Sequence, residues 1–219
     1  CIVKESSENA SSPPIRIMRK YTPVRSDQPG YFELLIKRYD TGNVSQHIFN
    51  MEIGDRLLMR GPFGIYQYTP EPKHPIVMIA MGTGITPMYQ IIQHVVNDEH
   101  DTTQLTLLYG SRTEEDILLY RELQLLTERY PNKLTVHYFI SKPSNNDNIS
   151  GSTDADTVSS SRMHKNQRIN LESLREIEPE IKIREASQVL LCGTDDFCHN
   201  IKTICKEEYG QTDDKIHVF

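Results

Sequence analysis

The sequence has no apolar run long enough to cross a membrane and no secretory signal. None of its hydrophobic stretches approaches the roughly 18–20 residues that a bilayer-spanning helix needs. Its first residues, CIVKESSENASSPP, have neither the basic nor the apolar region of a signal peptide. We therefore expect a cytoplasmic protein. Because residue 1 is cysteine and not methionine, we also expect a missing upstream segment, which would allow attachment at the cytosolic face of a membrane.

Cysteine is scarce, and its spacing excludes two classes of protein. Cys1, Cys192, Cys198 and Cys205 have neither the spacing of a metal site nor that of a disulfide framework. Cys198 and Cys205 lie seven residues apart, which places them on one face of a helix as small apolar side chains. The histidines considered as ligands are scattered and unpaired in the sequence: His47, His74, His94, His100 and His137. We expect no metal and a reducing, intracellular setting.

Positive charge is in deficit, with a net charge of −6. Residues 1–70 hold nine Lys/Arg and seven Asp/Glu, whereas the remainder holds fifteen and twenty-three. No basic stripe with interleaved aromatics occurs, so nucleic acid is not an expected partner. The weak excess of +2 in residues 1–70 favours an acidic protein partner, although a solvated surface gives the same pattern. Nothing in the composition indicates an oligomeric state.

The first 73 residues have the pattern of an antiparallel barrel or sandwich. YFELLIKRY (31–39) is rich in aromatic and branched residues, and RLLMRG (56–61) follows a Gly54-Asp55 turn. The stretch NVSQHIFNM between them is short and is interpreted as a helical turn. Prolines separate these segments, as is typical of short strands joined by turns.

Strands and helices alternate in residues 74–219. PIVMIAM (75–81) is a continuous apolar run, typical of a strand buried on both faces. We expect further strands at 104–110, 134–140 and 187–193, and helices at about 87–97, 114–130, 171–178 and 195–209. Strict alternation predicts a parallel sheet covered by helices on both faces. The polar stretch 143–167 lacks large apolar groups and is expected to be a mobile surface insertion.

Two glycines end the apolar run, in GTGITP (82–87), and suggest a ligand site. Gly82 and Gly84 permit positive φ and close approach of a ligand, and the backbone N–H groups at the start of the next helix favour a phosphate. Thr86 is a good N-cap and Pro87 suits the first helical position. The simpler alternative is a buried strand that turns into a capped helix with no ligand.

Eight segments in register resemble one family. They are RKYTPV (19–24), YFELLIKRY (31–39), GNVSQ (42–46), MEIGD (51–55), RGPFG (60–64), GTGITPM (82–88), LYGSRTEEDILLYREL (108–123) and LLCGTDDF (190–197). In this order the chain resembles the NADH–cytochrome b5 reductase family of the ferredoxin–NADP reductase superfamily. The resemblance implies an FAD-binding antiparallel barrel at 1–73, whose N-terminal strands are missing, and an α/β NAD(P)-binding domain at 74–219.

The resemblance also implies where FAD binds. Arg19 would pair with its pyrophosphate, which the guanidinium fork suits. Tyr21 would lie against the flavin ring, and Thr22 would lie within hydrogen-bond reach of it. The remaining residues implied for FAD are Lys20, Leu35, Lys37, Asn43, Val44 and Ser45. Solvated charges, an edge aromatic and a helix cap are the structural alternatives.

In the second domain the resemblance implies a site for NADH or NADPH. Gly82, Thr83 and Gly84 would face the dinucleotide, and Thr86 would reach toward the flavin. Cys192, followed by Gly193, would lie beside the nicotinamide and orient it, without acting as a nucleophile; a buried structural cysteine is the alternative. Phe219, the last residue, is assigned to the same site.

Two departures from the family pattern affect specificity. Ser141 and Lys142 stand where an acidic residue would disfavour the 2′-phosphate of NADPH, so both nucleotides are expected to be accepted. Arg112 is a further candidate for that region. Asn43 replaces a family lysine and supplies a hydrogen bond without charge.

Together these features predict a flavin-dependent reductase. It would pass a hydride from NAD(P)H to FAD and then single electrons to a cytochrome b5-type acceptor. The alternative from another class is a truncated, non-catalytic nucleotide-binding module.

Overall fold

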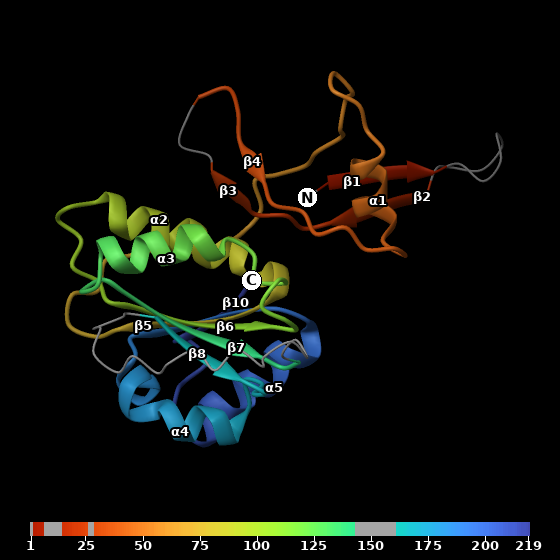
Figure 1. Ribbon diagram of the computed structural model, residues 1–219. Coiled ribbons are helices and arrows are strands. Elements are labelled where there is room, and N and C mark those ends of the chain that lie inside the picture. The colour runs from red at the N-terminus through yellow and green to blue at the C-terminus, as the bar shows by residue number, and fades with distance from the viewer. Residues whose placement is uncertain (1, 7–14, 26–28, 143–160) are drawn as a thin grey trace, which may run out of the picture. The chain divides into compact units, whose positions relative to one another are not determined.

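The chain forms two compact units, Cys1–Tyr66 and Gln67–Phe219. A computed structural model describes residues 2–6, 15–25, 29–142 and 161–219 (Figure 1). The second unit contains most of the long apolar segments and all of the long helices among these residues.

The second unit is built on a six-stranded parallel sheet. Its strand order is β10-β9-β5-β6-β7-β8, and every neighbouring pair is parallel. The strands are β5 (Ile76–Met81), β6 (Leu105–Ser111), β7 (Leu134–Ile140), β8 (Ser161–Lys165), β9 (Gln188–Cys192) and β10 (Ile216–Val218). The α/β fold predicted from the alternating pattern is therefore confirmed.

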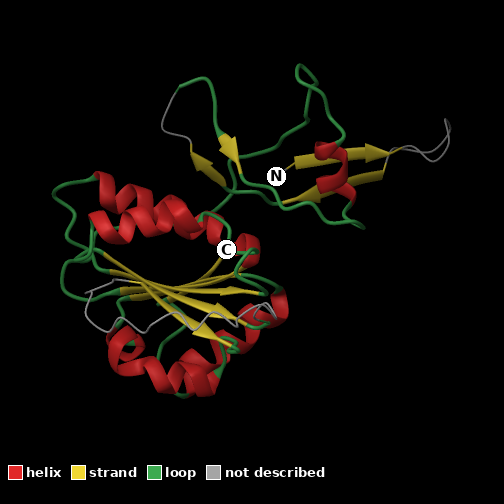
Figure 2. Ribbon diagram, in the orientation of Figure 1, coloured by secondary structure: helices red, strands yellow, loops and turns green. Residues whose placement is uncertain are grey.

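Helices cover both faces of this sheet, as Figure 2 shows. They are α2 (Ile85–Asn97) and α3 (Tyr120–Arg129) on one face, and α4 (Leu171–Ile181) and α5 (Asp195–Glu207) on the other. Short 3₁₀ turns, η1 (Gly82–Gly84) and η2 (Ile183–Glu185), precede α2 and follow α4. Parallel strands need helices or long connections between them, because the chain must return to the other end of the sheet before its next strand begins.

The core lies on both sides of β5, whose residues Ile76 to Ala80 are completely buried. On the α4/α5 face, Val77 and Ile79 pack with side chains of both helices, among them Leu174 and Ile201. Strand side chains alternate between the two faces, so a strand that is covered on both faces is apolar throughout. The run PIVMIAM reflects this double burial.

Two predicted elements of the second unit need correction. The helix expected from residue 114 begins at Tyr120, because Leu119 adopts a left-handed conformation (φ 59°) that interrupts the helix. Residues 161–165, expected to belong to a polar surface insertion, form the edge strand β8. An edge strand has only one neighbour and is largely exposed, so it tolerates polar residues such as Arg162 and Lys165. Residues 143–160 of that insertion lie outside the described part of the chain.

The first unit consists of two antiparallel pairs and one helix. β1 (Ile2–Ser6) pairs with β2 (Ile15–Arg19), and β3 (Pro23–Arg25) pairs with β4 (Glu33–Leu34). The helix α1 (Asn43–Phe49) follows. The predicted antiparallel fold is confirmed as a partial antiparallel arrangement of strands.

The strands predicted at 31–39 and 56–61 are wrong in extent. Only Glu33 and Leu34 of the first segment are paired, and Met59 of the second forms a single bridge to Ile2. A strand requires a hydrogen-bonded partner, and residues 23–25 offer β4 only a short one. Within the two segments, Phe32 and Leu58 are among the large apolar side chains that are exposed.

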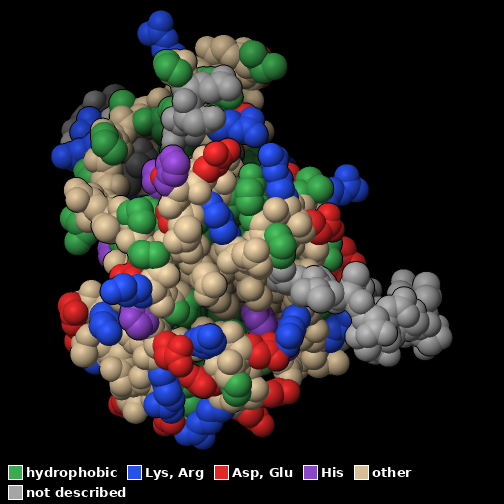
Figure 3. All heavy atoms as spheres, turned by 90° about the vertical axis from the view of Figure 1, so that its left-hand side faces the viewer, with side chains coloured by type: hydrophobic (Ala, Val, Ile, Leu, Met, Phe, Trp, Pro, Cys, Tyr) green, Lys and Arg blue, Asp and Glu red, His purple; other side chains and the backbone are tan. Residues whose placement is uncertain are grey.

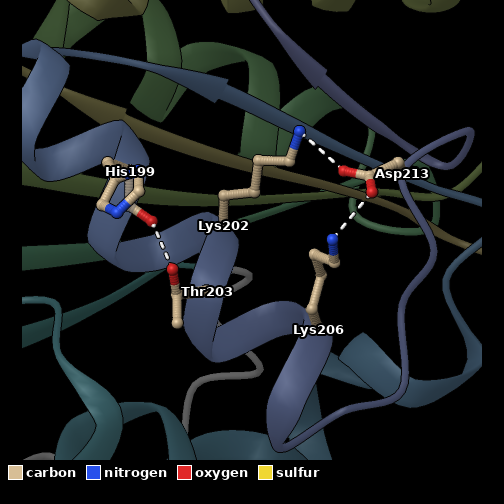
Figure 4. Close-up of polar contacts among 5 residues, drawn as sticks. All are labelled: His199, Lys202, Thr203, Lys206 and Asp213. Atoms are coloured by element: carbon tan, nitrogen blue, oxygen red, sulfur yellow. Dashed lines mark hydrogen bonds and ion pairs between the residues drawn. The ribbon is translucent and has the colours of Figure 1, made fainter.

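An ion-pair cluster holds the loop before β10 to helix α5 (Figure 4). Lys202 Nζ lies 2.8 Å from Asp213 Oδ1, and Lys206 Nζ lies 2.7 Å from Asp213 Oδ2. These two hydrogen bonds lower the pKa of Asp213 to about 2. The two lysines are one helical turn apart, so one carboxylate can accept from both.

A buried polar network fixes the segment that leads into β5. The Tyr68 hydroxyl lies 2.6 Å from Asp101 Oδ2 and 2.9 Å from Thr103 Oγ1. The Glu71 N–H donates to Thr103 Oγ1, and the Thr103 N–H donates to Asp101 Oδ1. Burial raises the pKa of Asp101, but the hydrogen bonds from Tyr68 and Thr103 outweigh burial and leave it lowered.

Replacing Asp101 by Asn is expected to destabilise the second unit by about 1–3 kcal/mol near neutral pH, because an amide oxygen accepts these hydrogen bonds less strongly. A carboxyl whose pKa is lowered by folding stabilises above its unfolded pKa and loses that contribution as the pH falls through its folded pKa. The difference between wild type and Asp101→Asn should therefore shrink below about pH 4. Urea unfolding of both proteins near neutral pH and below about pH 4 measures this difference in unfolding free energy. Glu99→Gln, at an exposed neighbour, is the control. A difference that is the same at both pH values contradicts the prediction.

Candidate functional site

The ends of β5 and β9 meet closely at the carboxyl edge of the sheet. Ala80 of β5 is the register partner of Cys192 of β9, and Gly84 in the turn after β5 lies directly against it. A Cβ built on Gly84 would lie 2.2 Å from the Cys192 carbonyl oxygen and 2.6 Å from its carbonyl carbon. Only glycine fits there, so GTG and CG, 108 residues apart in the sequence, occupy one place.

The glycine turn is shaped by one left-handed residue and by a tyrosine. Gly82 has φ +55°, and the space beside it is open, since a Cβ there would meet no atom within 4 Å. The Tyr109 hydroxyl donates to the Gly82 carbonyl at 2.9 Å and accepts from the Leu118 N–H at 3.3 Å. Burial raises the pKa of Tyr109 to about 12, so it remains a neutral donor. Tyr109 was missed by sequence reasoning, because an aromatic residue inside an apolar strand suggests only core packing.

The roles predicted for Thr86 and Pro87 in starting the helix are wrong. Helix α2 begins at Ile85 with Gly84 as N-cap, and no side chain caps it. Thr86 is buried, and its hydroxyl donates to the Thr83 carbonyl at 3.2 Å. The 3₁₀ turn of Gly82–Gly84 runs into the helix and shifts the start upstream, which leaves Pro87 in the first turn, where its missing N–H is still no loss.

The end of β9 leads directly into helix α5. Cys192 is half-buried and Gly193 is exposed. Thr194 caps the helix by accepting from the Phe197 N–H, and Asp195 and Asp196 lie in the first turn, where carboxylates stabilise the positive end of the helix dipole. A phosphate is disfavoured at this helix start because the two carboxylates repel it.

The last residue of the chain lies at the same edge. The Phe219 N–H donates to the Leu191 carbonyl at 3.1 Å, and its ring contacts His217 edge-on. Phe219 is therefore held beside the end of β9, at Leu191, the residue before Cys192.

The ends of β6 and β7 are joined on the other side of the turn. The Ser141 N–H donates to the Ser111 carbonyl, and the Lys142 N–H donates to the Arg112 carbonyl at 2.8 Å. Arg112 and Lys142 are both exposed. Since neighbouring strands lie about 4.8 Å apart, Ser141 is about 10 Å along the edge from the glycine turn. Over the face seen in Figure 3, cationic and anionic side chains are interspersed.

The residues predicted to bind FAD surround the exit of β2. Arg19 ends this strand and is exposed, with one guanidinium nitrogen 2.8 Å from the Met18 carbonyl; Lys20 is exposed as well. Tyr21 and Thr22 are half-buried. Burial raises the pKa of Tyr21, and the charge of nearby Arg19 opposes that shift.

The remaining predicted FAD residues lie between β4 and α1. Leu35 and Lys37 are half-buried, Asn43 is the exposed first residue of α1, and Val44 is buried. Ser45 is also buried, and its hydroxyl accepts from the Tyr39 N–H and donates to the Gly42 carbonyl. Ser45 thus ties the turn before α1 to the first turn of the helix, but it is not the helix cap: Gly42 is the N-cap and no side chain caps the helix.

Comparison with known families defines the class of the protein. The model of the oxidoreductase NAD-binding domain matches residues 78–203, and that of the oxidoreductase FAD-binding domain matches residues 9–68. The chain belongs to the family of oxidoreductases with this NAD-binding domain. Among the described residues, no helix is both long and apolar enough to span a bilayer.

Relatives within this class confirm the resemblance to cytochrome b5 reductases. NADH-cytochrome b5 reductase 1 of Kluyveromyces lactis is 48% identical over 128 residues, which are 58% of this chain and 46% of that protein. The matched part is thus about half the length of this curated relative.

Solved structures agree on the fold. The cytochrome b5 reductase domain of Ulva prolifera nitrate reductase has a TM-score of 0.75 and 27% identity over 100% of this chain and 82% of that one. The CS-b5R domains of human Ncb5or have a TM-score of 0.73 at 22% identity, over 100% of this chain and 59% of that one.

A side chain at Gly84 should damage the edge more than one at Gly82. Gly84→Ala would place its Cβ against backbone that cannot move aside, and we expect a loss of about 3 kcal/mol of unfolding free energy. Gly82→Ala faces open space and carries only the strain of a left-handed alanine, about 1 kcal/mol. Urea unfolding of both variants measures the two losses of unfolding free energy. Equal losses would show that the close Gly84–Cys192 contact is not what makes a side chain at residue 84 costly.

Proposed function

We propose that the chain belongs to a flavin-dependent reductase that transfers a hydride from NAD(P)H to FAD and single electrons from there to a cytochrome b5-type acceptor. The observation that carries the proposal is the Gly84–Cys192 contact, which places a nucleotide-type glycine turn against the backbone of the half-buried Cys192 at the carboxyl edge of a parallel sheet. Ligands of open parallel sheets bind at this edge. The match to both an FAD-binding and an NAD-binding family model supports the same conclusion.

The residues of the second unit suit a nicotinamide dinucleotide. The open space beside Gly82 and the N–H groups at the start of α2 would accommodate the pyrophosphate. Cys192 and Gly193 would border the nicotinamide, and Phe219 would lie next to them. The thiol would position the ring by packing, so no proton transfer or covalent step is assigned to Cys192.

The residues of the first unit suit FAD. Arg19 would neutralise the pyrophosphate with its planar guanidinium, and Tyr21 and Thr22 would contact the ring system. Lys20, Leu35, Lys37 and the α1 start at Asn43, Val44 and Ser45 would contact the remainder. The bound cofactors supply the redox chemistry, and the protein holds them in place.

The acceptor is proposed from the relatives. Those most similar to this chain carry the name NADH-cytochrome b5 reductase, which implies a small haem protein as acceptor. The weakly basic composition of residues 1–70 agrees with an acidic partner of this kind. We place the reaction in the cytoplasm.

Retention of flavin tests the reductase proposal. The purified chain, incubated with FAD and desalted, should keep the visible absorbance of bound flavin. Arg19→Gln should weaken FAD binding about tenfold or more, since a charge-assisted hydrogen bond contributes about 1.5–3 kcal/mol. Arg16→Gln, in the same strand, is the matched control and should bind as wild type does.

A wild-type chain that remains colourless while still binding NADH would contradict the reductase proposal and support the alternative of a non-catalytic nucleotide-binding module. Equal weakening by both arginine variants would show a general charge effect and remove Arg19 from the site.

Nucleotide preference tests the assignment of Ser141 and Lys142. Near Lys142 a 2′-phosphate would be tolerated, so we expect Lys142→Asp to shift the NADH/NADPH affinity ratio toward NADH by about tenfold, which corresponds to 1.4 kcal/mol. Lys73→Asp makes the same charge change before β5, at the opposite edge of the sheet, and should leave the ratio unchanged. Titration with each nucleotide measures it; a strong NADH preference that is the same in wild type and Lys142→Asp would refute the assignment.

A further inference from the structure

Two histidines far apart in the sequence form a close pair where β8 joins the sheet. His137 Nδ1 of β7 lies 3.1 Å from His164 Nε2 of β8, and the rings are stacked with an interplanar angle of 13°. His164 also stacks on Phe139, with ring centroids 4.5 Å apart. The pair was invisible in the sequence, where His137 has no histidine near it and its partner lies in a polar insertion. None of the roles proposed above for the cofactor sites uses it.

The pair is the buried end of a row of polar side chains that lies between β8 and helix α4. His137 is opposite Arg162 in the strand register, and Phe139 is opposite His164, so all four side chains face the same side of the sheet. Arg162 forms an ion pair with Glu180 of α4. His137 is 1% exposed, whereas Arg162 is largely exposed.

The other side-chain attachments of β8 described by the structure lie at or near the surface. Ser161 Oγ donates to Gln124 Oε1 of α3, and Lys165 Nζ lies 3.0 Å from Glu114 Oε1. Both partners of the second contact are about 40% exposed or more, and such ion pairs contribute little. As an edge strand, β8 has backbone bonds to β7 alone within the described sheet. The histidine contact differs from these attachments because it includes the buried His137 and its hydrogen bond depends on the protonation of both partners.

An imidazole–imidazole hydrogen bond needs one N–H donor and one bare nitrogen acceptor. Two neutral histidines meet this need with either ring as the donor, provided that the other ring presents its bare nitrogen. One added proton has to enter at the second nitrogen of the donor ring, outside the contact. It places a positive charge in a pair whose member His137 is buried. A second added proton would direct two N–H groups at each other across 3.1 Å, which abolishes the bond and leaves two adjacent positive charges.

Charged groups around the two histidines have opposite effects on their protonation. On β8, Arg162 disfavours it, while Glu176 and Glu180 of α4 favour it. Burial is the largest effect and lowers the pKa of His137 to about 4; burial likewise lowers the pKa of His164. The folded pair thus binds fewer protons than the unfolded chain at acidic pH. Its contribution to stability is full above the ordinary histidine pKa and is lost as the pH falls toward the folded values.

We propose that the His137–His164 contact is a pH-sensitive latch, which holds the edge strand β8 on β7 near neutral pH and releases it when the pair takes up protons. Release exposes both rings to water, separates the two charges and breaks the backbone bonds between β8 and β7. Beyond the strand, the Gln167 N–H donates to the Ile140 carbonyl at 3.1 Å, so release would also loosen the end of β7. Ser141 and Lys142 follow directly, and an effect on nucleotide binding there rests on the proposed function, whereas the latch itself does not.

Hydrogen exchange of the intact chain at several pH values tests the latch. The exchange of β8 amides, expressed as a ratio to those of the central strand β6, corrects for the pH dependence of chemical exchange. Below about pH 6.5 the opening of β8 relative to β6 should rise, by up to about tenfold per pH unit for each proton taken up on opening. A ratio that stays constant down to about pH 4.5 refutes the latch.

His164→Phe keeps an aromatic ring on Phe139 and removes the titrating partner. In this variant the rise of the β8/β6 ratio should fall to that of a single buried histidine or less. His199→Gln, an exposed histidine on α5, is the matched control and should behave as wild type. If His164→Phe shows the full wild-type rise, the pair is not the sensor.

The wild-type protein supplies a second measurement in case the variant folds poorly. Titration of the imidazole resonances by NMR should show both His137 and His164 titrating below the ordinary pKa of histidine. Resonances of both rings that titrate near 6.5, as in an unfolded chain, overturn the proposal.

Discussion

The parallel pairing of β5 with β9 on one side and β6 on the other is the constraint on which the second unit depends. Parallel neighbours force a helical crossover between strands, and helices on both faces require β5 to be apolar along its whole length. The same pairing brings all the carboxyl ends to one edge. The glycine turn, Cys192 and the Ser141–Lys142 pair therefore assemble without any contact that is local in the sequence.

Three buried polar contacts fix positions inside this apolar unit. Tyr109 holds the glycine turn through the Gly82 carbonyl, Asp101 receives hydrogen bonds from Tyr68 and Thr103, and His137 meets His164. An unpaired buried polar group would cost more than such a bond contributes, so these contacts fix geometry more than they add stability. The Tyr109–Gly82, Tyr68–Asp101 and His137–His164 contacts each join segments at least 27 residues apart, whereas the Thr103–Asp101 bond is local.

Sequence reasoning located the parallel strands well and the polar details poorly. PIVMIAM is uniformly apolar and the strand at 134–140 is largely apolar, so their hydrophobic patterns identify them as buried strands. Thr86 was misassigned as a cap because the 3₁₀ turn of Gly82–Gly84 shifts the helix start, and nothing in a local pattern distinguishes the two starts. The composition of residues 161–165 predicts a polar surface insertion, because only their pairing with β7 makes them a strand. The roles of the predicted cofactor residues remain predictions.

The sequence alone determined the fold class, the two-part organisation and the likeness to cytochrome b5 reductases, because burial periodicity and motif order are properties of the linear chain. Only the tertiary structure decided which groups meet. Gly84 must be glycine because the Cys192 carbonyl lies against it, and His137 meets His164 because β8 lies beside β7. Both facts depend on distances between residues 27 or more positions apart, which sequence spacing does not encode.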